Sequence, residues 1–465
     1  MEYSIYLIIL IIFFFTLVFI TYYFHKTYPE LKWDWKDINL NKINFPNNFI
    51  WGTATAAHQI EGSCENNWSE FEKGYKSNGL PNIKNNQNSG IACDSWNRYE
   101  EDITLMKKLG VSHYRFSIEW SKIQPTENDI NKDAIIHYHD IIDCLFEHNI
   151  VPVITLYHFT HPIWFEKKGA FEKEENIKYF NKFCKLIFRE FSPKVKFWCT
   201  INEPAVMTSM GYFNAEFPPG KSDPQLCAIV LYNLLNAHVE VYQTLKNLKH
   251  GSESRIGIVK NINHFDPWKR WNPLDWIATW AVNKFFNNST IEFFKTGYYN
   301  VKIPGLMWYS KYNEHALKSN DFIGLNYYSH NYLKFNWSIS DPFEIKYKYD
   351  DIMTDMPYAI YGEGLYRSIK DISVLKLPIY ITENGIADMK DDRRELFIKR
   401  YLYALSKALR DGYDVKGYFY WSLLDNFEWA FGYDMKFGLF EVNFETQERR
   451  LRKGAEVFKK IVSAN

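Results

Sequence analysis

The sequence of 465 residues predicts an α/β fold, a single (β/α)8 TIM barrel preceded by an N-terminal transmembrane helix. Three observations support this prediction. Eight short runs are continuously apolar, as expected of parallel strands that are buried on both faces. Longer segments with a helical period separate these runs, and eight β–α units in one chain favour a closed barrel. The first run continues as GTATAAHQIEG, which lacks the glycine-rich phosphate turn that an open, doubly wound sheet would carry.

The first expected element is a membrane anchor at residues 5–24, behind a short flank of residues 1–4. This run of 20 residues carries no charge and is about as long as a bilayer is thick. No basic residue precedes it and no A-x-A-like cleavage site follows, so we predict an uncleaved anchor, with a cleaved secretory signal as the alternative. Lys26, Lys32 and Lys36 follow the run, which favours a cytosolic position for the rest of the chain.

A polar stem at residues 25–44 leads to one domain at residues 45–465. The predicted strands of this domain lie at residues 49–56, 112–120, 151–159, 195–203, 255–263, 322–329, 378–385 and 417–425. The helical period is clearest at residues 99–110, 133–149, 177–191 and 395–412. Gly110 and Gly412 end two of these helical segments, where a left-handed conformation costs glycine little.

Composition argues against several classes of function. Lys plus Arg and Asp plus Glu both number 55, so the net charge does not favour a nucleic-acid partner. The aromatic content of 18% is high, and a large aromatic core explains it more simply than sugar-stacking platforms do. The six cysteines show no C-x-x-C spacing, and no His/Cys/Asp cluster has ligand spacing. We therefore predict no metal and no other cofactor.

Polar side chains gather at the C-terminal ends of the predicted strands, which meet at one mouth of a barrel. These residues are Gln59, Glu61, Arg115, Glu119, His158, Asn202, Glu203, Asn326, Tyr328, Glu383, Asn384, Trp421, Glu428 and Trp429. Glu203 and Glu383 end the fourth and seventh strands, so we expect their carboxyl groups to face each other. Two carboxyl groups about 5 to 5.5 Å apart suit glycoside cleavage with retention, in which one attacks the anomeric carbon and the other protonates the leaving oxygen. Arg115 beside one carboxylate would hold it ionised.

Six motifs follow one another from about residue 45 onward: FIWGTATAAHQIEG, YRFSIEWSKIQP, TINEP, GLNYYS, YITENG and YWSLLDNFEWAFGY. Together, in this order, they resemble the signatures of glycoside hydrolase family 1, the β-glucosidase family. The resemblance implies a retaining β-glycosidase that needs no metal. It implies Glu203 as the acid/base and Glu383 as the nucleophile, with Arg115 and Tyr328 as partners of the nucleophile and Asn326 orienting the acid/base side. The substrate-binding residues that it implies are Gln59, His158, Asn202, Trp421, Glu428 and Trp429.

Three positions depart from the family pattern. Phe159 stands where many members have Trp, Glu119 where many have Ser, and Ala215 where Gly is usual. The extra carboxylate of Glu119 near the mouth is expected to be either solvated or paired. None of these departures removes a catalytic group.

Two other functions stay open as alternatives. Relatives that act on 6-phosphorylated sugars carry Ser at the position of Glu428, so the retained carboxylate favours an unphosphorylated sugar. A non-catalytic membrane-anchored receptor on this fold would normally lose a catalytic carboxylate, and both are present.

The expected partner is a small β-O-glycoside with terminal glucose, galactose, fucose or mannose, and the residues of the sugar shell do not decide among them. The aglycone is expected to contact loops at residues 205–225, 330–365 and 430–440. Aromatic residues at 333–351 either form a platform for it or pack on the barrel. The anchor suggests the hypothesis that glycolipids or sterol glycosides are substrates.

Overall fold

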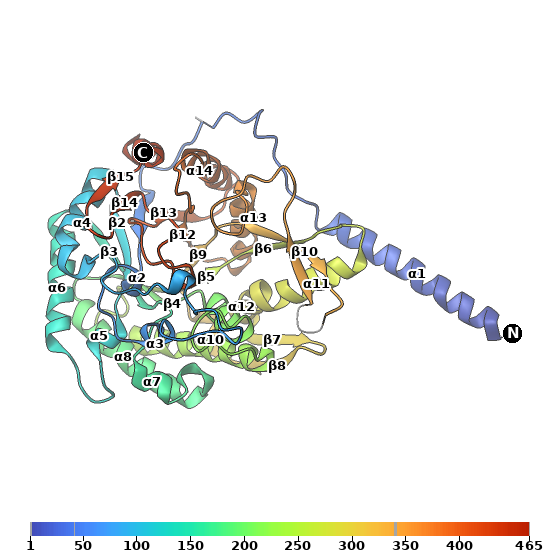
Figure 1. Ribbon diagram of the computed structural model, residues 1–465, viewed down its shortest axis with the longest axis horizontal. Helices are drawn as coiled ribbons and strands as arrows, with labels where there is room; N and C mark the ends of the chain where they lie inside the picture. Colours follow the sequence, from blue (N-terminus) through green and yellow to red (C-terminus); the bar gives the residue numbers. More distant parts are fainter. Residues whose placement is uncertain (1, 41, 339–341, 465) are drawn as a thin grey trace.

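The computed structural model of the protein describes residues 2–40, 42–338 and 342–464 (Figure 1). Eight parallel strands close into a barrel in the order β1–β13–β12–β9–β5–β4–β3–β2. They are β1 (Ile50–Ala54), β2 (His113–Ser117), β3 (Val151–Tyr157), β4 (Phe197–Asn202), β5 (Arg255–Asn261), β9 (Phe322–Asn326), β12 (Ile379–Asn384) and β13 (Val415–Trp421). Each strand overlaps one of the eight runs predicted from the sequence. The predicted TIM barrel is therefore confirmed.

The strands that precede the two glutamates are buried along their whole length. All six residues of β4 and all six of β12 are buried, which explains why neither sequence alternates between apolar and polar residues. Both strands shift register near their C-terminal ends, β4 against β5 after Cys199 and β12 against β9 after Ile381. Such irregularities re-aim side chains. Glu203 and Glu383 thus emerge where regular strand pairing stops.

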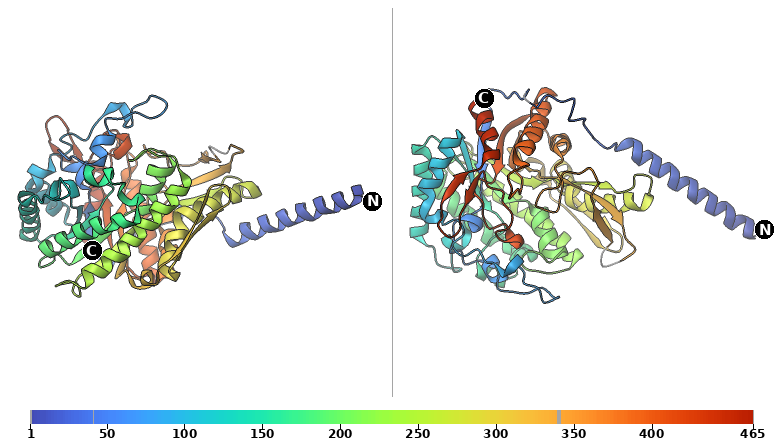
Figure 2. Two further views of the ribbon diagram at one scale, coloured as in Figure 1. Left: turned by 90° about the horizontal axis from the view of Figure 1, so that it is seen from below. Right: turned by 45° about the horizontal axis from the view of Figure 1, so that its top comes forward.

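Helices cover the outside of the barrel (Figure 2). The longer ones are α4 (Ser95–Leu109), α6 (Lys132–Glu147), α8 (Ile177–Phe191), α10 (Pro224–Lys246), α13 (Gly362–Ile372) and α14 (Arg394–Arg410). The four segments with helical period correspond to α4, α6, α8 and α14. In α8, the face that carries Phe180, Phe183, Cys184 and Ile187 is buried in the core, as its period predicts. Gly110 and Gly412 adopt left-handed φ angles of +81° and +89°, as expected.

The other helices follow several strands or close the barrel: α2 (Ala57–Ile60), α3 (Asn67–Phe71), α5 (Trp120–Ile123), α7 (Ile163–Lys167), α9 (Pro204–Thr208), α11 (Pro273–Asn283), α12 (Ser289–Thr296) and α15 (Glu456–Ala464). Three small sheets supplement the barrel. The first contains β6 (His264–Pro267), β10 (His330–Phe335) and β11 (Phe343–Lys346), the second β7 (Tyr298–Ile303) and β8 (Met307–Tyr312), and the third β14 (Phe440–Val442) and β15 (Arg449–Leu451). The first two sheets and α11 lie on the side of the barrel from which α1 projects (Figure 1).

The N-terminal helix α1 (Glu2–Thr27) projects away from the barrel (Figure 1). Its apolar part, Ile5–Thr27, has a mean hydropathy of 2.8 in its most apolar window, and only 6% of that window is buried. Length and composition alone allow this helix to cross a membrane, and a signal sequence has the same properties. Its C-terminal end packs on α11, where Phe24 stacks on Trp276 with ring centroids 5.5 Å apart.

Candidate active site

A cavity of about 280 Å³ opens at the C-terminal ends of the barrel strands. Of the side chains that the sequence predicts for the site, its lining includes His158, Glu203, Tyr328, Glu383, Trp421, Glu428 and Trp429. The other predicted residues, Gln59, Arg115, Asn202 and Asn326, lie behind this lining and are wholly buried. The structure thus brings together the residues that the family resemblance implies, whereas Glu61, Glu119 and Asn384, also expected at the mouth, do not line the cavity.

Glu383, at the end of β12, is held by a cation and a phenol. The guanidinium of Arg115 donates from Nη1 to Oε1 at 2.5 Å, and the Tyr328 hydroxyl donates to Oε2 at 2.8 Å. Burial raises the pKa of the Glu383 carboxyl, and Arg115 and Tyr328 oppose that rise. Burial likewise disfavours the charged form of Arg115, but the charge and hydrogen bond of Glu383, together with Cys199 and Glu203, give a net rise in the pKa of Arg115. Each group therefore favours the charged form of the other.

Glu203 has a different environment. It follows β4 with a left-handed φ of +44°, uncommon for a residue with a side chain, and Pro204 then begins α9. Its Oε1 accepts from the amide Nδ2 atoms of Asn326 at 2.7 Å and Asn261 at 3.1 Å. Burial, and next the charge of Glu383, raise the pKa of Glu203 to about 8. At neutral pH this carboxyl group therefore carries a proton.

A chain of hydrogen bonds joins the two carboxyl groups. Arg115 contacts Glu383 with Nη1 and donates from Nη2 to Asn202 Oδ1 at 2.7 Å. Asn326 Nδ2 donates to the same Asn202 oxygen at 3.2 Å and to Glu203 at 2.7 Å. Thr382 fixes Asn326 in turn by donating to its Oδ1 at 2.6 Å. Both glutamates therefore belong to one polar network beneath one cavity.

Glu428 lines the cavity and forms a second polar pair with Gln59, which lies behind it. Gln59 Nε2 donates to Glu428 Oε2 at 3.2 Å and to the Phe427 carbonyl oxygen at 2.9 Å. Gln59 Oε1 is buried and has no hydrogen-bond partner among the described residues. Burial, and next the charge of Glu383, raise the pKa of Glu428 to about 8. This pair offers an acceptor and a carboxyl group to polar groups of a ligand.

His158 lies between flat apolar surfaces. Its ring stacks at 5.7 Å from the Trp421 ring and at 6.0 Å from the Trp429 ring. Nε2 contacts Asn202 Nδ2 at 3.1 Å, while the buried Nδ1 has no partner in the part of the chain that the structure describes. Burial, and next the nearby Arg115, hold the pKa of His158 well below its usual range. A neutral histidine that accepts at Nε2 presents its Nδ1 proton to a ligand.

Glu119 is paired, not solvated. Its side chain is fully buried and accepts from the Ser121 hydroxyl at 2.7 Å and the Thr160 hydroxyl at 2.8 Å. It also caps α5 by accepting from the Ser121 backbone N–H. The structure therefore assigns this departure from the family pattern to loop stability.

The other two departures from the family pattern, Phe159 and Ala215, both adopt positive φ angles. Phe159 has a φ of +69°, lines the cavity and packs against Trp429 with ring centroids 5.2 Å apart. Ala215 has a φ of +57°, a conformation that explains why Gly is usual at this position.

Asn261 is a site residue that the sequence interpretation did not identify. It ends β5 and donates to Glu203, so it acts on the carboxyl group with the raised pKa. The signal was present, because an asparagine ends this strand as one ends β4, β9 and β12. Its partner could not be read from the sequence, because the pairing of β4 with β5 is irregular at this end.

Comparisons with known proteins agree with this geometry. A family model described as glycosyl hydrolase family 1 matches residues 41–465. The chain belongs to this family. It is 32% identical to β-glucosidase A of Acetivibrio thermocellus, covering 92% of this chain and 100% of that protein. It is 29% identical to a β-galactosidase of Pyrococcus woesei, covering 90% and 97%. A solved structure, a β-glycosidase from Pyrococcus horikoshii, matches with a TM-score of 0.81 and 39% identity, covering 90% of this chain and 95% of that one.

Family membership confirms the resemblance found in the sequence motifs and supports a glycoside hydrolase on a TIM barrel. The cavity that holds Glu203 and Glu383 is the candidate active site of this enzyme.

Proposed function

We propose that the protein is a retaining β-glycosidase that releases terminal β-linked glucose from O-glycosides, with galactose or fucose as further glycones. One observation carries this proposal. Arg115 donates to Glu383, whereas Glu203 accepts only from the amides of Asn326 and Asn261 among its described contacts. A charged nucleophile beside a protonated acid is what the first step of retaining hydrolysis needs.

In the first step, Glu383 attacks the anomeric carbon while Glu203 gives its proton to the glycosidic oxygen. The aglycone leaves as an alcohol and the sugar stays bound to Glu383 as an ester. This ester is neutral, so the charge that helps to raise the pKa of Glu203 is removed. Having given its proton to the aglycone, Glu203 stays a carboxylate because the neutral ester no longer repels its charge, and this carboxylate takes a proton from the attacking water. The resulting hydroxide displaces Glu383 and restores the enzyme.

The remaining predicted residues bind the sugar in this proposal. Gln59 and Glu428 accept from or donate to sugar hydroxyl groups, and His158 donates from Nδ1 to a further hydroxyl. Trp421 and Trp429 supply flat faces for the apolar side of the ring. Asn202, fixed by Arg115, contacts the 2-hydroxyl, an interaction that strengthens as charge develops on the ring.

The alternatives have less support. A 6-phosphate would need cationic side chains, and no described residue that lines the cavity is Lys or Arg. The carboxyl groups that line the cavity, including that of Glu428, would instead repel the phosphate. A binding-only protein would not need the pKa difference between the two glutamates, and the relatives reported above are named as glycosidases.

Hydrolysis of p-nitrophenyl β-glucoside tests the proposal directly. The wild-type protein should release nitrophenol, and proton NMR should show the β-anomer of glucose first. Glu383→Gln should lower kcat/KM roughly 10⁴-fold or more. Initial release of the α-anomer would rule out retention, and full activity of Glu383→Gln would rule out its role as nucleophile.

We also propose that α1 is an uncleaved single-pass membrane anchor with the barrel on the cytosolic side. The exposure of its apolar surface and the Lys residues that follow it support this arrangement. The protein should stay with membranes after alkaline carbonate extraction, and its N-terminal peptide should be found by mass spectrometry. A mature chain that begins after residue 27 would show a cleaved signal instead.

A further inference from the structure

A second cavity, here called the apolar groove, adjoins the candidate active site. Its volume is about 580 Å³, and it lies between α11, the β7–β8 turn and the sheet that contains β10 and β11. Its walls include Phe213, Ile277, Leu306, Phe335, Phe343 and Ile345. No described residue that lines it carries a charge. Such a surface favours an apolar ligand, since an oligosaccharide would need polar partners for its hydroxyl groups.

The apolar groove meets the catalytic cavity on the side of the acid/base. Ser209, Met210, Asn263 and Phe286 line both cavities. Two of them follow Glu203 closely in the chain, and Asn263 lies two residues beyond Asn261, which donates to Glu203. The leaving group takes its proton from Glu203, so it must lie on this side. None of the proposed sugar-binding residues lines the groove.

The groove also lies next to the N-terminal helix. Helix α11 contributes Ile277 and Ala281 to the groove. The same helix receives the end of α1, because Phe24 stacks on Trp276. Just before α11, the exposed Trp271 stacks on His25 with ring centroids 4.5 Å apart. One helix thus forms both a wall of the groove and the contact with the end of α1.

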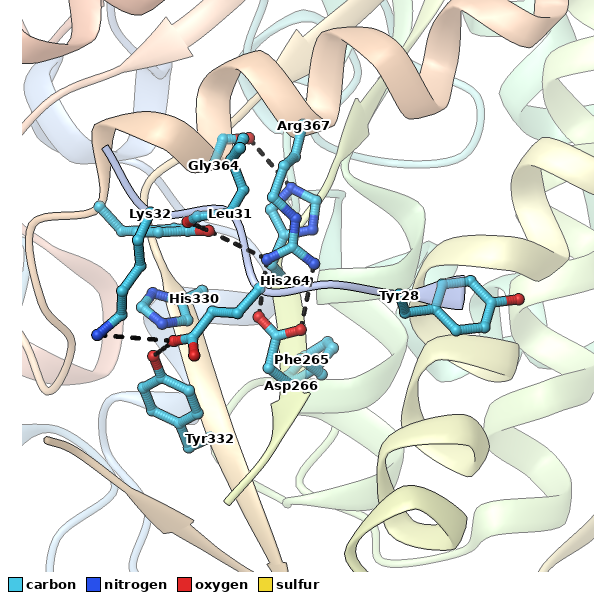
Figure 3. Close-up of polar contacts among 12 residues, drawn as sticks. Tyr28, Leu31, Lys32, His264, Phe265, Asp266, His330, Tyr332, Gly364 and Arg367 are labelled. Carbon is cyan, nitrogen blue, oxygen red and sulfur yellow. Dashed lines mark hydrogen bonds and ion pairs between the residues drawn. The ribbon is translucent and has the colours of Figure 1, made fainter. Parts of the chain in front are cut away.

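The stem does not behave as a free tether, because it is bound to the barrel (Figure 3). Glu30 accepts from the Tyr332 hydroxyl at 2.6 Å, and the Leu31 carbonyl oxygen accepts from the Tyr361 hydroxyl at 2.7 Å. Glu363 accepts from the Trp33 backbone N–H at 2.9 Å and from Trp35 Nε1 at 3.0 Å. These contacts hold the barrel close to the C-terminal end of α1. The mouth of the groove is therefore held near the surface of any bilayer that α1 crosses.

We propose that the apolar groove binds the lipid aglycone of a membrane-resident β-glycoside whose sugar occupies the catalytic cavity. The proposal rests on the β-glycosidase function proposed above and specifies its substrate class. The groove supplies an apolar surface on the leaving-group side. The stem and α11 place this surface beside the helix that would sit in the membrane. The tail of a lipid glycoside can then pass directly from the bilayer into the groove without being exposed to water.

Alkyl β-glucosides of increasing chain length test this inference with the full-length protein. Butyl, hexyl and octyl glucosides, each below its micellar concentration, should show kcat/KM rising by up to about fourfold for each methylene that the groove buries. We expect at least a tenfold gain from butyl to octyl. Both activities are measured on the same sample, so the ratio of octyl to butyl activity does not depend on how much of the enzyme is folded.

The matched variants are substitutions of exposed isoleucines. Ile277 and Ile345 line the groove and are 51% and 45% exposed, so a charge at either position is compatible with folding. Ile277→Glu combined with Ile345→Glu should reduce the octyl-to-butyl ratio to below threefold, because the tail would meet carboxylates. Ile136, on α6 and 58% exposed, lies outside the groove, so Ile136→Glu should leave the ratio unchanged.

The outcomes separate the two proposals. A protein that does not hydrolyse p-nitrophenyl β-glucoside contradicts the proposed function. A protein that hydrolyses it but gives equal kcat/KM for butyl and octyl glucosides contradicts the lipid proposal alone. Cellobiose turned over faster than octyl glucoside would assign the groove to a sugar aglycone and overturn the proposal. Loss of chain-length dependence in Ile136→Glu would overturn the assignment to this groove.

A vesicle experiment tests the role of the stem. Phosphatidylcholine vesicles that contain dodecyl β-glucoside present the substrate in a bilayer. Replacing Glu30 and Trp33 with Ala removes the carboxylate that accepts from Tyr332 and the ring that packs edge-on against Tyr366 and Tyr403. The rate on these vesicles should fall severalfold, while the rate on soluble octyl glucoside stays constant because neither Glu30 nor Trp33 lines the groove or the catalytic cavity. Equal rates on vesicles for both proteins would show that the stem does not present the groove to the bilayer.

Discussion

Glu383 and Glu203 are the same residue type in the same cavity, and they differ in what surrounds them. Glu383 accepts from a guanidinium and a phenol, while Glu203 accepts from two amides. Both are buried, so desolvation raises both pKa values. Of the two, only Glu383 contacts a cation among the described residues. In the proposed mechanism, these neighbours, and not the residue type, determine which carboxyl group attacks and which one donates a proton.

The largest effect is expected from removing Glu383, the proposed nucleophile. Glu383→Gln should lower kcat/KM roughly 10⁴-fold or more on every substrate, since even a good leaving group does not compensate for the loss of the attacking carboxylate. Steady-state rates on 2,4-dinitrophenyl and octyl β-glucosides measure this. A variant that keeps activity on the activated substrate would mean that another group attacks the anomeric carbon.

Glu203→Gln should separate the two glutamates by their dependence on the leaving group. The dinitrophenolate leaves without protonation, so its departure does not need the acid, whereas octanol does. We expect the loss in kcat/KM to be about 10²-fold greater on octyl β-glucoside than on 2,4-dinitrophenyl β-glucoside. Equal losses on both substrates would remove Glu203 from the role of acid.

Arg115→Met should abolish the difference in charge between the two sites. Without the guanidinium, only the hydrogen bonds of Tyr328 and Asn326 oppose the effect of burial on the pKa of Glu383, so this pKa rises further and the low-pH limb of kcat/KM should move to higher pH. We expect a loss of about 10²- to 10³-fold at pH 6. Arg115→Lys keeps a positive charge and should shift the limb less. Tyr328→Phe removes only one hydrogen bond to Glu383, so of the three variants it should shift the low-pH limb least.

The sequence predicted where the two glutamates lie in the barrel better than it predicted the side chains that contact them. Eight buried runs and their polar ends placed both glutamates and Arg115 at one mouth, because parallel barrel strands have a common C-terminal edge. Asn261 was missed although it also ends a strand, since its aim at Glu203 depends on an irregular register between β4 and β5. The pairing of Glu119 also depends on contacts between separate loops. The binding of the stem to the barrel joins residues about 330 positions apart, which no local pattern encodes.

Asn261→Ala tests the missed residue through a pH profile. The amide of Asn261 lowers the pKa of Glu203, so its loss should raise that pKa above about 8. The acid must be protonated, and the high-pH limb of kcat/KM should therefore move upward by about half a pH unit. Asn263→Ala is the matched control, because the Asn263 side chain has no described contact with Glu203. A limb that stays in place, or moves equally in both variants, contradicts the role given to Asn261.

The smallest expected effect is on thermal stability, and it again separates the two glutamates. The pKa of Glu203 is about 8 in the folded protein, whereas an unfolded Glu titrates near about 4.3. Between these values the native state binds more protons than the unfolded state, so Glu203 costs stability progressively as the pH rises. Glu203→Gln removes this cost, and its Tm relative to wild type should be about 1 to 3 °C higher at pH 8 than at pH 5. Glu383→Gln instead leaves the buried Arg115 unpaired and should lower Tm at both pH values. Differential scanning calorimetry at the two pH values measures both variants. A Tm difference for Glu203→Gln that is equal at pH 5 and pH 8 would mean that its carboxyl group does not hold its proton through this range.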